Sequence, residues 1–195
     1  MIAFSPKMAF ALLSQQGKAP ADSLLICAGG GYADSLSVSA TGRPVLLVNG
    51  GKTALTTSQK NYLDSIGKRN IYIIGGPNSV SDTIATQLNA YDTDGATKRI
   101  AGDGREETSA KVAQEFFPEA SFAVLADGNN YPDGLSGGPV AYAKDAPLLL
   151  IRAKRESHAR DYVGDRIKEG YIMGGINSVS DESAKAIFGE NAQIK

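Results

Sequence analysis

Few residues in this chain have side chains that do chemistry in pairs or clusters. His158 is the only histidine among the 195 residues, and Cys27 is the only cysteine. One cysteine cannot form an internal disulfide, and one histidine cannot build a histidine-rich metal site. A Ser-His-Asp arrangement could therefore form at no more than one place in the chain.

Two aspartates, Asp34 and Asp133, each lie a few residues beyond a short apolar segment. Parallel α/β sheets bind ligands beyond the carboxyl ends of their strands, so a catalytic role is one interpretation. Acid–base chemistry would also need a second carboxylate, a histidine or a cysteine nearby, and none accompanies both aspartates. We expect both residues to cap helices, and we expect no catalytic residue, cofactor or metal ion in this chain.

Basic side chains gather in one stretch of the second half: Arg152, Lys154, Arg155, Arg160, Arg166 and Lys168. The first three directly follow the apolar segment Pro147–Ile151, which places them at the ligand-binding end of a strand. Two interpretations are open, a solvated helix face and a rim that contacts an anion.

Two glycine-rich segments resemble phosphate-binding loops but lack the full motifs. Asn49–Thr53 (NGGKT) matches the end of a P-loop, yet Leu46 occupies the position of its first glycine. Gly29–Gly31 lacks the spacing of a dinucleotide-binding fingerprint. We therefore expect no nucleotide P-loop.

These candidates sit on a chain that repeats itself. Three pairs of segments recur in the same order: Tyr32–Leu36 with Tyr131–Leu135, Pro44–Val48 with Pro147–Ile151, and Tyr72–Asp82 with Tyr171–Asp181. The last pair, YIIGGPNSVSD and YIMGGINSVSD, is identical at nine of eleven positions, 99 residues apart. The middle pair is offset by 103, so the second copy has four extra residues ahead of it. The chain is an internal duplication.

The longest repeated segment encodes a strand, a tight turn and a helix. Ile71–Ile74 is a short β-branched run of the kind found in buried strands. Gly75 and Gly76 follow it, as Gly174 and Gly175 do in the second copy. Ser81 then suits a helix N-cap, with an aspartate in the first turn. This succession is half of a βαβ unit.

The remaining elements alternate in the same way. Strands are expected at residues 24–28, 45–48, 71–74, 122–126, 148–151 and 171–173, with a short extended segment at 99–101. Helices are expected over 5–16, 33–39, 58–66, 81–89 and from an Asp103 cap to about 117. Short buried strands alternating with helices predict an α/β protein of two similar modules, each a small, mainly parallel, Rossmann-like sheet flanked by helices. We expect the modules to be residues 1–95, incomplete at its start, and 96–195.

The composition limits which classes of binding partner are expected. The residues are 42% hydrophobic and 21% charged, with a net charge of −1, as in ordinary globular proteins, so we expect no nucleic-acid partner. No run approaches 18 apolar residues, so we expect no membrane span. The apolar run Met8–Leu13 is too short for a signal peptide, and an export signal is expected upstream of it.

Four ordered motifs resemble the type-2 cell wall-binding repeat found on surface proteins of clostridia and related Gram-positive bacteria. They are the Tyr-x-Asp-x-Leu, Pro-aliphatic and Gly-Gly-x-Asn-Ser-Val-Ser-Asp segments of both copies, and Arg99–Thr108 (RIAGDGREET), which contains Arg105 and Thr108. The resemblance covers nearly the whole chain. In the first copy nothing corresponds to Arg99–Thr108.

The resemblance implies a secreted, non-catalytic module that attaches a protein to the cell wall by binding an anionic polysaccharide or a teichoic-acid-like polymer. It associates attachment with the Pro-aliphatic motif, here Pro44, Val45, Leu46 and Leu47 in the first copy and Pro147, Leu148, Leu149 and Leu150 in the second. Arg152, Lys154 and Arg155 are the expected anion contacts. The alternative function is a small-molecule or nucleotide-binding enzyme on a Rossmann-like scaffold.

The resemblance also implies three repeats around a pseudo-threefold axis, whereas this chain has two. A module face that normally meets a third repeat would be apolar and uncovered. We therefore expect the chain to self-associate.

Overall fold

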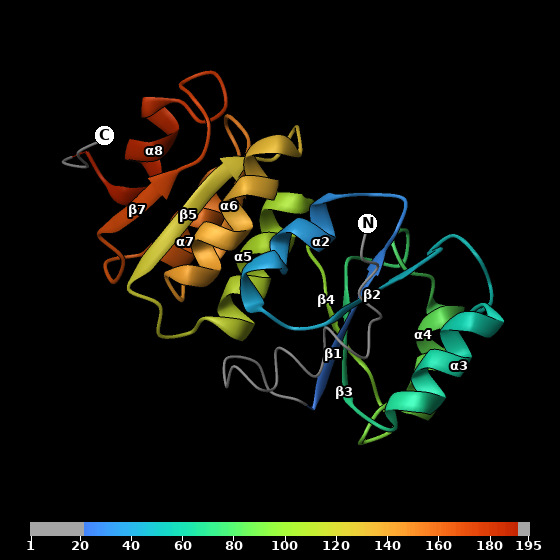
Figure 1. Ribbon diagram of the computed structural model, residues 1–195. Coiled ribbons are helices and arrows are strands. Elements are labelled where there is room, and N and C mark those ends of the chain that lie inside the picture. Colours follow the sequence, from blue (N-terminus) through green and yellow to red (C-terminus); the bar gives the residue numbers. More distant parts are fainter. Residues whose placement is uncertain (1–21, 191–195) are drawn as a thin grey trace, which may run out of the picture. The chain divides into compact units, whose positions relative to one another are not determined.

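The structure is a computed structural model that describes residues 22–190 (Figure 1). Packing divides the chain into two units. Of the described residues, unit 1 holds 22–35 together with Gly42–Ile100, and unit 2 holds Leu36–Thr41 together with 101–190. The helix expected over 5–16 lies outside the described residues, and the module boundary at 95/96 stays a prediction.

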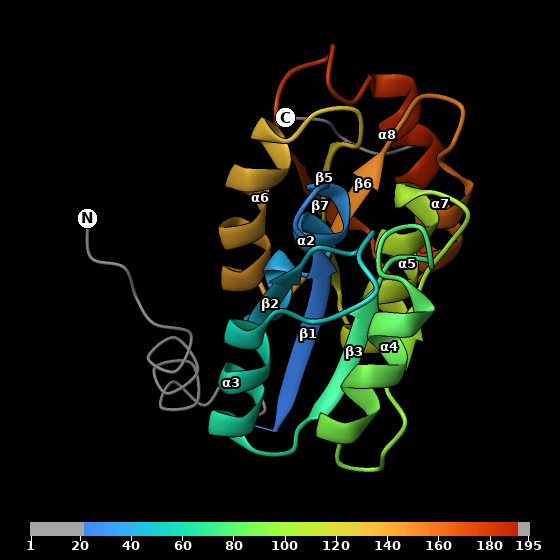
Figure 2. The same cartoon turned by 90° about the vertical axis from the view of Figure 1, so that its right-hand side faces the viewer.

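Unit 1 is built on a four-stranded parallel sheet with the strand order β2-β1-β3-β4. The strands are β1 (Ser23–Ala28), β2 (Val45–Val48), β3 (Asn70–Ile74) and β4 (Lys98–Ile100). The helical segments are α2 (Ala33–Ser37), which runs across the division between the units, α3 (Thr57–Ile66), α4 (Asp82–Leu88) and the short 3-10 turn η2 (Asn89–Tyr91). Alternate strand residues such as Ile26 and Ile73 face Leu63 of α3 and Ile84 of α4, so both helices cover one face (Figure 2).

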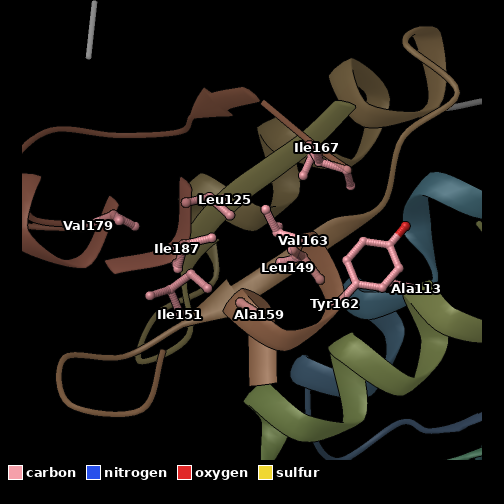
Figure 3. Close-up of a cluster of buried hydrophobic side chains, with 11 residues drawn as sticks. Ala113, Leu125, Leu149, Ile151, Ala159, Tyr162, Val163, Ile167, Val179 and Ile187 are labelled. Carbon is pink, nitrogen blue, oxygen red and sulfur yellow. The ribbon is translucent and has the colours of Figure 1, made fainter. Parts of the chain in front are cut away.

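Unit 2 contains a three-stranded parallel sheet with the order β6-β5-β7. Its strands are β5 (Phe122–Asp127), β6 (Leu148–Ile151) and β7 (Glu169–Ile172). Its helical segments are η1 (Ser39–Thr41), α5 (Arg105–Phe116), α6 (Pro132–Ala143), α7 (Ser157–Val163) and α8 (Asp181–Phe188). Leu125 and Leu149 pack against Val163 and Ile187 on one face (Figure 3). Val124 and Leu148 face α6 on the other.

The two units repeat one arrangement. In each, the first strand is central and pairs in parallel with the next two, β1 with β2 and β3, β5 with β6 and β7. The predicted fold class, two parallel sheets flanked by helices, is confirmed.

The Gly-Gly turns follow β3 and β7, where the sequence predicted them. Gly75 has φ 97° and Gly174 has φ 93°, a conformation that residues with a Cβ rarely adopt. A methyl group on Gly75 would lie 2.3 Å from Asp34 Oδ2, and one on Gly174 would lie 2.4 Å from Asp133 Oδ2. Each aspartate carboxylate therefore packs directly on the turn of its own copy.

The capping role predicted for Asp133 is wrong, and the one predicted for Asp34 stays a prediction. Asp34 is the second residue of α2 and Asp133 the second residue of α6, whose N-cap is Tyr131. Each carboxylate lies against the Gly-Gly turn of its own copy, in the space that a side chain on Gly75 or Gly174 would occupy.

Other helix starts were predicted with mixed success. Ser81 caps α4, and its Oγ accepts the Ile84 N–H at 3.3 Å, as expected. Asp103 was expected to cap α5, but the N-cap is Gly104. The Asp103 N–H instead donates to Glu107 Oε2 at 2.7 Å. The Glu107 side chain therefore folds back and supplies the acceptor for this loop amide. The helix expected to reach Ser39 ends at Ser37.

Replacing Gly174 with alanine should destabilise the protein by about 2 kcal/mol or more, because a Cβ would strain the positive φ and displace the Asp133 carboxylate. Gly175→Ala is the matched control, because nothing lies within 4 Å of its added methyl group. Urea unfolding of both variants measures the difference. Equal losses would contradict the packing of Asp133 on the turn.

Candidate functional site

The Pro-aliphatic segments occupy equivalent strands but differ in exposure. In β2, Val45 is 37% exposed and Leu47 is 51% exposed, whereas Leu148 and Leu150 of β6 are fully buried. Helix α6 lies on the face of Leu148, and Gly137 allows it to approach closely. Its counterpart α2 is only five residues long, and the residues that follow it belong to unit 2.

Most side chains of the two Pro-aliphatic segments are packed inside the protein. Those that are buried are Pro44, Pro147, Leu148, Leu149 and Leu150, and Leu46 is half-buried. Their side chains fix the position of the edge strand and of the loop that leaves it, since packed apolar side chains hold a strand in register.

The Arg99–Thr108 motif shapes the loop that enters α5. Thr108 Oγ1 accepts the Gly102 N–H at 3.0 Å, and the Arg105 guanidinium donates to the Gly128 carbonyl. The Glu107 carboxylate accepts a hydrogen bond from the Asp103 N–H, and its Oε1 lies 2.9 Å from Lys111 Nζ. Both contacts hold the pKa of Glu107 below its usual range. Loop and helix start are therefore held by side chains of the motif itself.

A buried ion pair joins this helix start to the end of β6. Glu106 is 2% exposed, and its carboxylate accepts two bonds from Arg152, one from Nε and one from Nη2 at 2.9 Å. Ser109 Oγ reinforces the junction by accepting the Leu150 N–H at 3.0 Å. Such two-point contacts between a guanidinium and a carboxylate fix the orientation of both groups. The Arg152 guanidinium is thus held against the buried Glu106 carboxylate.

Nothing in the sequence pattern indicated the role of Glu106. It has the position of an ordinary carboxylate in the first turn of a helix, where the helix dipole alone explains it. Its partner lies 46 residues away, and no spacing in the sequence connects the two residues.

The loop after β6 carries the two other predicted basic residues in a constrained conformation. Lys154 has φ 65°, and the Arg155 N–H donates to the Arg152 carbonyl at 3.0 Å. Glu156 Oε1 accepts the Lys154 N–H at 3.0 Å and Ser183 Oγ at 2.5 Å. Burial raises the pKa of Glu156, but these hydrogen bonds outweigh it and leave the pKa below its usual range. Glu156, another residue that the sequence did not single out, therefore holds the loop as an anion.

A pocket of about 290 Å³ lies where this loop meets the start of α5. Its lining residues are Asp103, Gly104, Glu106, Glu107, Lys154, Arg155, Ser157 and His158. Glu106 and Glu107 are already paired with Arg152 and Lys111, while Lys154 and Arg155 form no ion pair within residues 22–190. The free cations and the amino end of α5 favour a negatively charged group, and Asp103 and Ser157 can bond to hydroxyl groups.

The other predicted site residues do not meet in this pocket. Asp34, Gly75 and Gly76 lie in unit 1, and Asp133 packs on the Gly174–Gly175 turn. Within residues 22–190 there is no cluster of three or more His, Cys, Asp or Glu side chains suited to a metal ion. No helix in that range could span a membrane.

Among the curated proteins similar to this chain are two from Bacillus subtilis (strain 168). The N-acetylmuramoyl-L-alanine amidase LytC is 33% identical over 107 residues, which are 52% of this chain and 21% of the relative. The amidase enhancer is 32% identical over 127 residues, which are 65% of this chain and 17% of the relative. The chain thus spans about a fifth of the length of these proteins.

Two solved structures from Clostridium difficile share the fold. Cwp6 matches with a TM-score of 0.76 and 22% identity over 97% of this chain and 31% of its own. Cwp8 matches with a TM-score of 0.72 and 23% identity over 85% of this chain and 29% of its own. The family model of cell wall binding domain 2 matches twice, over residues 7–85 and 99–184, and the chain belongs to this family, CWB2.

Proposed function

We propose that this chain is a non-catalytic anchor that attaches a secreted protein to the cell wall by binding an anionic polysaccharide or a teichoic-acid-like polymer. Membership of CWB2, a family of binding modules, supports the association with the wall. The polyanionic partner is supported by one observation, the pocket of unit 2, where Lys154 and Arg155 form no ion pair with any of the described residues.

The basic residues divide into contact and positioning roles. Lys154 and Arg155 are at the surface and carry the proposed contacts to phosphate or carboxylate groups of the polymer. Arg152 positions them, because its guanidinium is held by the buried Glu106 carboxylate and its carbonyl accepts the Arg155 N–H. Screening by salt should act on the first two residues much more than on the third.

The Pro-aliphatic motifs divide in a similar way. Val45 and Leu47 are exposed and are the members that can touch a polymer directly. Leu148 is buried beneath α6, Leu150 is also buried, and both support the loop that begins at Arg152. A long polymer touched weakly at several points gains affinity through effective concentration, which suits a duplicated module.

Removing the two free cations should weaken wall binding without unfolding the protein. We expect Lys154→Asn with Arg155→Gln to lower affinity for purified walls at least about tenfold and to flatten its salt dependence, because charge-assisted hydrogen bonds contribute about 1.5–3 kcal/mol each. Asparagine is chosen at position 154 because it tolerates φ 65°. Co-sedimentation across a salt series gives both quantities.

The matched control is Lys168→Gln with Lys185→Gln, which removes the same charge from exposed positions outside the pocket. This control should bind as the unmodified chain does. Equal losses for the two variants would leave only a general charge effect and remove the pocket from the mechanism.

Arg152 should behave as a structural residue. Arg152→Ala leaves the buried Glu106 carboxylate unpaired and should cost about 3–5 kcal/mol of unfolding free energy. Lys168→Ala, which breaks the exposed pair with Asp165, should cost less than about 1 kcal/mol. Urea unfolding compares them, and an Arg152→Ala variant as stable as Lys168→Ala would overturn the positioning role.

Self-association stays a prediction. Large apolar side chains are exposed in each unit taken by itself, and exposed apolar side chains favour association: Val45 and Leu47 in unit 1, and Tyr131, Leu135, Tyr171 and Ile176 in unit 2. Light scattering should show the mean mass rising with concentration. A single monomeric mass at millimolar concentration would contradict it.

A further inference from the structure

The outer edge of β7 is open. β5 lies on one side of β7 (Figure 1), and within residues 22–190 no strand pairs with the other. The Met173 N–H donates to the Leu125 carbonyl of β5 at 2.8 Å. Because successive amides of a strand point to opposite sides, the N–H groups of Ile172 and Gly174 point to the open edge.

The equivalent edge in unit 1 is occupied by β4. Its residues Lys98, Arg99 and Ile100 pair in parallel with residues 72–74 of β3. The Gly75 N–H donates to the Ile100 carbonyl at 2.9 Å. This bond extends the ladder into the Gly-Gly turn.

Arg99 fastens β4 through its side chain. Its Nη1 donates to the Gly75 carbonyl at 2.9 Å, and its Nη2 lies 3.0 Å from Asp82 Oδ1. One guanidinium thereby joins the turn after β3 to the first turn of α4. The added strand is thus recognised by backbone pairing and by one charge.

Unit 2 presents the same receiving groups without a strand. Gly174 corresponds to Gly75, and Asp181, in the first turn of α8, corresponds to Asp82. Over the described part of the chain, Asp181 has no ion pair and the Gly174 N–H has no acceptor. Gly75 is buried, whereas Gly174 is exposed despite an almost identical sequence around it.

The boundary between the two repeats indicates which kind of segment fits the open edge of β7. The second family match begins at Arg99, yet Arg99 and Ile100 complete the sheet of unit 1. The opening strand of one repeat therefore completes the sheet of the repeat before it.

We propose that the outer edge of β7 is the docking site for the opening strand of a further repeat. This strand adds in parallel beside Tyr171–Met173 and carries an arginine followed by a branched aliphatic residue. The arginine bonds to the Gly174 carbonyl and pairs with Asp181, and the strand backbone accepts the Gly174 N–H. Backbone pairing supplies the attraction, and the acidic start of α8 selects a basic strand.

The test is a chain in which Thr97–Gly102 is copied directly after Lys195. The copy then lies 99 residues beyond the original, which is the offset of the repeated segments. Hydrogen exchange of the Ile172 and Gly174 amides should slow by at least about tenfold relative to the unextended chain. A tail of the same six residues in scrambled order is the control and should leave both amides unprotected.

Asp181→Asn in the extended chain should reduce the protection, while Glu182→Gln, one residue further along α8, should not. Equal exchange with and without the native tail, or equal protection by the scrambled tail, would overturn the proposal. Protection that rises with concentration in the unextended chain would assign the edge to a second copy and would also overturn it. None of these readouts depends on wall binding, so the proposed function can fail independently.

Discussion

An aspartate carboxylate packed on a glycine turn organises the carboxyl edge of both sheets. Asp34 meets Gly75 in unit 1, and Asp133 meets Gly174 in unit 2, each where an added methyl group would overlap the carboxylate. The contact joins the helix after the first strand to the turn after the third. The glycine is required twice over, for its positive φ and for its missing side chain. One local constraint therefore sets the ends of parallel strands in both copies.

On this common scaffold, unit 2 builds a charged pocket at the start of α5. Glu106 is buried at the start of α5, and burial of a carboxylate is tolerated because Arg152 binds it at two points. The same arginine begins the loop whose next residues carry the free cations. A buried ion pair that contributes little net stability can still fix geometry, and here it fixes where Lys154 and Arg155 stand.

The sequence predicted what depends on local pattern and on repetition. The strands around Ile26, Ile73 and Leu149 were predicted from apolar runs, and the Ser81 cap from residue type. Features that depend on distant partners were not predictable. The cap of α5 was misplaced because the loop before it is closed by Glu107, and the buried Glu106 looked like a surface residue because Arg152 is far away in sequence.

The sequence also did not indicate which residues of the Pro-aliphatic motifs are exposed. Val45 and Leu148 occupy matched positions in matched strands, yet one is exposed and the other buried. The four extra residues of the second copy lie between Leu135 and Pro147, a segment that contains the second half of α6 and the loop after it, and α6 covers Leu148. The insertion was visible in the sequence, but its consequence for burial required the packing of the helix.

Binding to purified cell walls before and after their anionic polymers are stripped tests the central claim most directly. If this chain is an anchor for such polymers, it co-sediments with intact walls, is released by high salt, and does not bind the stripped walls. Undiminished binding to stripped walls would contradict the account, because the attachment would then lie in the remaining wall matrix.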